Sequence, residues 1–130
     1  MQTSKRIAQI LVSLGSLVLF AACALHGIFG YRGVFDALRG TTAPQDVIRG
    51  LKAVWFIIAW HWAVIGIVAL VAAFSRSQLR RVIVLMCGIV VMADAAGMYA
   101  ALGVFIGNEV IFTSALMLLA GAALFPAAQS

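Results

Sequence analysis

Long stretches without charged side chains dominate this sequence and limit what it can fold into. The first extends from Ile7 to Phe29 and the second from Ala53 to Phe74. The third, from Val82 to Ile106, contains a single acid, Asp94, and the fourth extends from Val110 to Phe125. At a rise of about 1.5 Å per residue, helices of this length cross a hydrocarbon core of about 30 Å. We therefore predict four transmembrane helices at about 7–29, 53–74, 82–106 and 110–125.

The composition agrees with this prediction and excludes other classes of protein. Apolar residues make up 65% of the chain and charged residues only 10%, whereas soluble globular domains have roughly 25% charged residues. The nine Lys and Arg residues lie at the edges of the apolar runs, not along one solvated face as in nucleic-acid-binding proteins. We expect one all-α integral membrane domain over residues 1–130, whose partner is the lipid bilayer and not a nucleic acid.

The connections predict the topology of the four helices. Short turns make the second and third helices, and the third and fourth, antiparallel neighbours, as in an up-down four-helix bundle. If the N-terminus is cytoplasmic, the cytoplasmic side carries the basic residues Lys5, Arg6, Arg76, Arg80 and Arg81, and the opposite side carries Arg32, Arg39, Arg49 and Lys52. This small excess favours cytoplasmic termini by the positive-inside rule. The compact chain and short loops suggest a bacterial inner membrane.

The connection over residues 30–50 is the long outer loop of this arrangement. Apolar residues alternate with charges over 34–38 and predict a short amphipathic turn at the membrane interface. Thr42, followed three residues later by Gln45, is typical of a helix start. The second helix is therefore expected to begin in water. At the other outer connection, Asn108 is expected to cap the fourth helix.

Three ionisable side chains fall inside the predicted spans: His26, His61 and Asp94. Each costs several kcal/mol in hydrocarbon unless it is paired or hydrated. From the midpoint of each run, Asp94 lies at the midplane, and His61 lies about 4 Å and His26 about 12 Å to the outer side. His61 and Asp94 belong to adjacent helices at similar depth, so they can form a buried hydrogen bond. In a functional interpretation, the two residues of this hydrogen bond act as a catalytic base and acid. In a structural interpretation, the bond holds the two helices in register.

Tryptophans surround one of these histidines. Trp55 and Trp62 are seven residues apart and share a helix face with each other, while Trp60 points elsewhere. Aromatic rings around a histidine can hold a flat lipophilic molecule such as a quinone, although Trp55 also suits an interfacial aromatic belt. The candidate ligand-binding residues are His26, Trp55, Trp62, Met98, Tyr99 and Glu109, and the candidate catalytic residues are His61 and Asp94.

Cofactor sites were considered for the same residues. His26 and His61 could supply both axial ligands of a haem, but their expected depths differ by about 8 Å. His26, His61, Asp94 and Glu109 are suitable metal ligands by type, yet no local spacing marks a metal site. We predict no metal and leave the cofactor open between haem, quinone and none.

Several functions fit this pattern. The first is a membrane protein that binds a lipophilic small molecule in a pocket in the outer half of the bilayer. The second is a membrane enzyme in which His61 and Asp94 form an acid–base pair for isomerisation or cyclisation of a lipid-like substrate. The third is a small proton-coupled transporter that works as a homodimer, because four helices enclose little space. An accessory subunit of a larger membrane complex is the remaining alternative.

Overall fold

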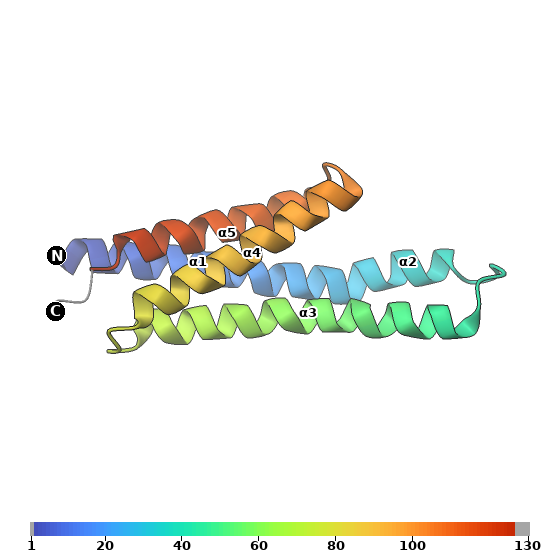
Figure 1. Cartoon of the computed structure of the whole chain (residues 1–130), viewed down its shortest axis with the longest axis horizontal. Coiled ribbons are helices and arrows are strands. Elements are labelled where there is room, and N and C mark those ends of the chain that lie inside the picture. The colour runs from blue at the N-terminus through green and yellow to red at the C-terminus, as the bar shows by residue number, and fades with distance from the viewer. Residues whose placement is uncertain (1, 127–130) are drawn as a thin grey trace.

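A computed structural model describes residues 2–126, which are helical apart from short connections (Figure 1). The elements are α1 (Gln2–Leu25), the π-helical segment η1 (His26–Gly30), α2 (Tyr31–Ala37), α3 (Gln45–Phe74), α4 (Arg80–Leu102) and α5 (Ile106–Leu124). The first three are continuous and form one helical rod of 36 residues.

Four helical segments are long and apolar enough to cross a membrane: Gln2–Ala37, Gln45–Phe74, Arg80–Leu102 and Ile106–Leu124. The prediction of an all-helical chain with four long apolar helices is therefore confirmed over the described residues. The third helix ends earlier than the predicted residue 106. Gly103 adopts a positive φ of 73°. A positive φ cannot continue a right-handed helix, and glycine adopts it without a steric penalty.

The turn between α4 and α5 differs from the expected one. Asn108 does not precede α5 but lies in its first turn, and Phe105 is the N-cap residue. The Asn108 side-chain amide instead donates a hydrogen bond back to the carbonyl of Gly103. Asn108 is fully buried and ties the start of α5 to the turn that precedes it.

The connection between α2 and α3 is much shorter than the predicted loop over residues 30–50. The first helix continues through Ala37, and α3 begins at Gln45 with Pro44 as its N-cap. The helix therefore begins later than expected, and Thr42 is not its cap. Residues 34–38 therefore do not form a separate interfacial turn. The reason is packing against α3: Phe35 is buried, and its ring lies 5.9 Å from that of Trp55, edge to face.

The helices alternate in direction, so the start of α1 and the end of α5 lie at the same end of the bundle (Figure 1). The Ser4 hydroxyl donates to the Leu124 carbonyl at 2.7 Å and ties α1 to α5 at this end. In Figure 1, α4 crosses the bundle and diverges from α3 towards the α4–α5 turn. The rod and α3 extend beyond that turn.

Small residues allow α1 to pack closely on α5. A Cβ atom added at Gly121 would lie 2.6 Å from Val12 Cγ2, and one at Gly15 would lie 3.2 Å from the Ser114 carbonyl oxygen. The buried Ser114 hydroxyl donates to the Gly15 carbonyl at 2.9 Å. Close approach through small residues and interhelical hydrogen bonds is typical of helix packing in apolar surroundings.

Candidate functional site

A cavity of about 850 Å³ lies between the two halves of the bundle. The end of α1, η1 and the middle of α3 line one side, and the last turns of α4, the α4–α5 turn and the start of α5 line the other. The cavity is in the half of the bundle distant from the described ends of the chain, where α4 diverges from α3 (Figure 1). Most of its wall is apolar.

The polar part of the wall is a cluster on α3 and α4. His61 Nε2 lies 3.1 Å from Asp94 Oδ2, and Trp62 Nε1 donates to the same oxygen at 3.2 Å. Two consecutive residues of α3 therefore contact one carboxylate oxygen of α4. The hydrogen bond expected between His61 and Asp94 is present. The hydrogen bond from Trp62 to Asp94 was not predicted, because a sequence does not show where an indole N–H is directed.

The Asp94 carboxylate limits the protonation states available to His61. An ionised carboxylate only accepts hydrogen bonds, so His61 Nε2 must then carry a proton, either in the neutral Nε2–H tautomer or in the charged imidazolium. Both states donate to Asp94. In the neutral tautomer, Nδ1 is free to accept a proton, which gives the pair an acid–base capacity.

The aromatic part of the wall is built around His26, the first residue of η1. Its ring stacks on Trp55 with centroids 4.0 Å apart and an interplanar angle of 8°, and Trp62 approaches it edge-on at 5.2 Å. Trp55 Nε1 donates to the His26 carbonyl at 2.9 Å. A Cβ atom at Gly30 would lie only 2.8 Å from Trp55 Cζ2, so Gly30 leaves room for the stacked ring. Single π-helical turns of this kind are frequent at functional sites.

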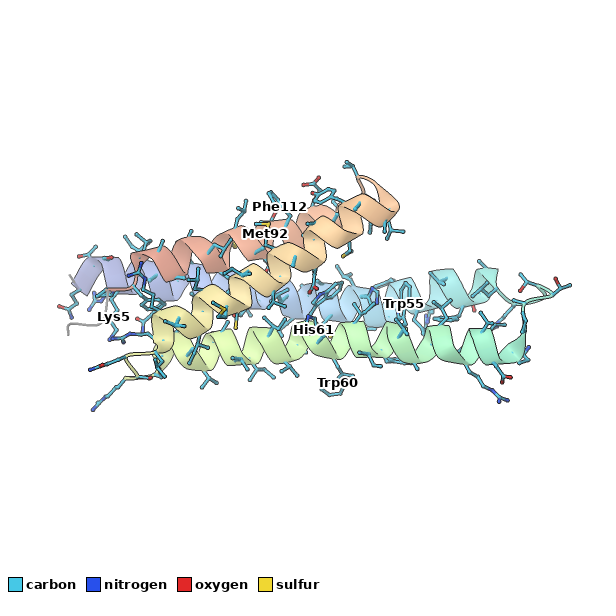
Figure 2. All side chains as sticks on the ribbon, viewed as in Figure 1. Lys5, Trp55, Trp60, His61, Met92 and Phe112 are labelled. Atoms are coloured by element: carbon cyan, nitrogen blue, oxygen red, sulfur yellow. The ribbon has the colours of Figure 1, made fainter. Side chains whose placement is uncertain are left out.

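His61 and Asp94 are more exposed than predicted. Their side chains are 42% and 30% accessible, whereas a buried hydrogen bond was predicted. Divergence of α4 from α3 is the physical reason, because it leaves both side chains on the cavity wall. Trp62 is buried, with 3% exposure, while Trp60 projects from the outer face of α3 with 69% exposure (Figure 2).

Six of the eight predicted site residues lie on this one cavity wall: His26, Trp55, His61, Trp62, Asp94 and Met98. Tyr99 and Glu109 do not line the cavity. Tyr99 is five residues after Asp94, so it lies on another face of α4 and contacts the Phe112 ring edge-on at 6.2 Å. Glu109 is exposed in the first turn of α5.

Other parts of the wall are not among the predicted site residues. Gly97 and Ala101 share the face of Asp94 on α4 and line the cavity. A Cβ atom at Gly97 would meet no atom within 4 Å, because this face borders the cavity. Phe105 and Ile106 also line it, and they were missed because the predicted third helix extended through them.

The histidines do not fit the axial ligation of a haem. His61 Nε2 is engaged by Asp94, and His26 Nε2 is covered and has no hydrogen-bond partner. An axial ligand must present a free nitrogen to the iron, and His61 Nε2 does not while it contacts Asp94. Within residues 2–126, no group of three or more His, Cys, Asp or Glu side chains could hold a metal ion. No protein-family model, curated protein or solved structure matches this chain.

Proposed function

We propose that the chain is an integral protein of a bacterial inner membrane, with both termini in the cytoplasm. Large apolar side chains are exposed on all four long helices, for example Leu17, Ile57, Met86 and Leu116. Such a surface suits lipid contact, since soluble monomers rarely expose large apolar patches. The larger group of basic residues is at the end where α1 begins, which favours a cytoplasmic location for that end.

We further propose that the cavity binds a lipophilic small molecule. The supporting observation is a space of about 850 Å³ with an apolar wall on which His61, Asp94 and Trp62 form one polar cluster. Ligand pockets typically measure about 300–1,000 Å³ and combine apolar walls with a few placed polar groups. In the proposed orientation the cavity lies in the outer half of the bilayer.

The rim of the cavity indicates where the ligand enters. Ile57, Leu102 and Ile106 line the cavity and are 65%, 67% and 79% exposed. An apolar, exposed rim faces hydrocarbon more favourably than water. The ligand therefore enters laterally from the bilayer, and the Asp94 cluster receives its polar group.

Analysis of copurifying molecules tests this proposal. The protein is extracted into nanodiscs with native lipids, and an absorption spectrum and mass spectrometry identify the molecules that are enriched over bulk lipid. Gly97→Phe places a ring where the structure has open space and should abolish that enrichment. Trp60→Phe changes an aromatic residue on the outer face and should preserve it. The same molecules in the same amounts from both variants would contradict the proposal.

The contact between His61 and Asp94 favours one second candidate, an isomerase or cyclase of a lipid-like substrate. Such a reaction needs one group that removes a proton from the substrate and another that returns one, and no external reactant. The pair faces the cavity and can fill both roles. Turnover of the copurified molecule should then show a bell-shaped pH profile that Asp94→Asn abolishes, and unchanged turnover in this variant would exclude the role of Asp94.

A further inference from the structure

We infer that the ligand is an amphiphile with a single hydroxyl group, a phenol or alcohol, whose O–H donates to Asp94. This inference rests on the proposed function, because it specifies the chemistry of the molecule in the same cavity. It follows from three features of the wall: where its polar atoms lie, which hydrogen bonds they already make, and which aromatic faces remain open.

The polar atoms are concentrated at one place. Asp94 and His61 project accessible polar side chains into the cavity, and the rest of the wall is mainly apolar or aromatic. Trp62 is buried, and its indole N–H is already used by Asp94. A molecule that matches this wall is apolar over most of its surface and carries one polar group at one end.

The hydrogen bonds of Asp94 identify that group as a donor. A carboxylate has about four acceptor positions on two oxygens. The two donors, from His61 and Trp62, both reach Oδ2, and no described residue donates to Oδ1. In apolar surroundings an unsatisfied carboxylate oxygen is costly. A ligand O–H satisfies it, whereas a ketone or ether, which only accepts hydrogen bonds, would repel it.

A neutral hydroxyl fits better than a cationic headgroup. Asp94 already receives two N–H donors, from His61 and Trp62, so its carboxylate is stabilised without a cationic ligand. Cation-binding cages present open aromatic faces to the charge. Here one face of Trp55 is covered by the stacked His26 ring at 4.0 Å, and Trp62 is turned towards Asp94 and His26.

Three probes of equal chain length distinguish these possibilities: 4-nonylphenol, its methyl ether 4-nonylanisole, and 4-nonylphenyl-trimethylammonium. The full chain carries Trp60→Phe, which removes the exposed indole on the outer face, and is placed in nanodiscs of saturated phosphatidylcholine. Binding is followed by the fluorescence of Trp55 and Trp62. Gly97→Phe in the same background measures probe that partitions into the lipid alone.

The phenol should bind at least about tenfold more tightly than its methyl ether, because the ether cannot donate to Asp94. In Asp94→Asn this preference should fall to about threefold or less, since a neutral amide accepts more weakly than a carboxylate. Equal binding of phenol and ether, both abolished by Gly97→Phe, would overturn the hydroxyl inference and leave the proposed cavity intact. Tightest binding of the ammonium probe would overturn it in favour of a cation site. Signals that Gly97→Phe does not change would overturn both proposals.

Discussion

Two glycines of α4 test whether the cavity exists, because alanine should have opposite effects at them. A Cβ atom at Gly88 would lie 2.8 Å and 2.9 Å from the Leu119 side chain and 3.1 Å from its backbone nitrogen. Overpacking of this kind costs about 1–3 kcal/mol. At Gly97 the added methyl group meets no atom within 4 Å. Replacing glycine by alanine in a helix is then worth up to about 1 kcal/mol in favour of folding.

The gain in helix propensity is common to both variants, so the free energy of unfolding should be about 1–3 kcal/mol higher in Gly97→Ala than in Gly88→Ala because of the overpacking alone. Unfolding is measured by titrating the protein in mixed micelles with sodium dodecyl sulfate and following tryptophan fluorescence. The free energy of unfolding of the unmodified chain should lie between those of the two variants. If Gly97→Ala loses as much stability as Gly88→Ala, Gly97 is packed against another helix and the cavity is not open at this position.

Two further matched pairs test the site and the packing that supports it. Gly30→Ala should displace the Trp55 ring, since its Cβ would lie 2.8 Å from Trp55 Cζ2, whereas the Cβ of Gly27→Ala would have no atom within 4 Å. Tryptophan fluorescence should therefore change in Gly30→Ala only. An equal change in both variants would refute the stacking of Trp55 beside Gly30. Ser114→Ala removes a buried hydrogen bond of 2.9 Å to α1 and should cost about 0.5–2 kcal/mol of unfolding free energy, while Thr113→Ala, at an exposed position, should stay within about 0.5 kcal/mol. Equal loss in both variants of the second pair, measured by the same detergent titration, would remove the role assigned to that bond.

Much of the candidate site could be predicted from the sequence, since depth along a helix depends only on residue number. The sequence places His61 and Asp94 at similar depth on adjacent helices, and in the structure His61 Nε2 lies 3.1 Å from Asp94 Oδ2. Helical spacing likewise places Gly97 and Ala101 on the face of Asp94, and both line the cavity. What could not be predicted was the environment of that face. A glycine at position 97 is compatible with close packing against another helix and also with a position on the wall of a cavity. Only the divergence of α4 from α3 shows that Gly97 is on the cavity wall.

The sequence alone determined the number of long apolar helices and the polar residues that they carry. Hydropathy and helical period are local properties, so uncharged runs specify these features without knowledge of neighbouring helices. The direction of α4, the contact of Phe35 with α3 and the separation of Tyr99 from the cavity depend on the tertiary structure. These depend on contacts between distant segments, such as Gly15 and Gly121 with their partners across α1 and α5. A crossing angle follows from side-chain shape at such contacts, which a one-dimensional pattern does not contain.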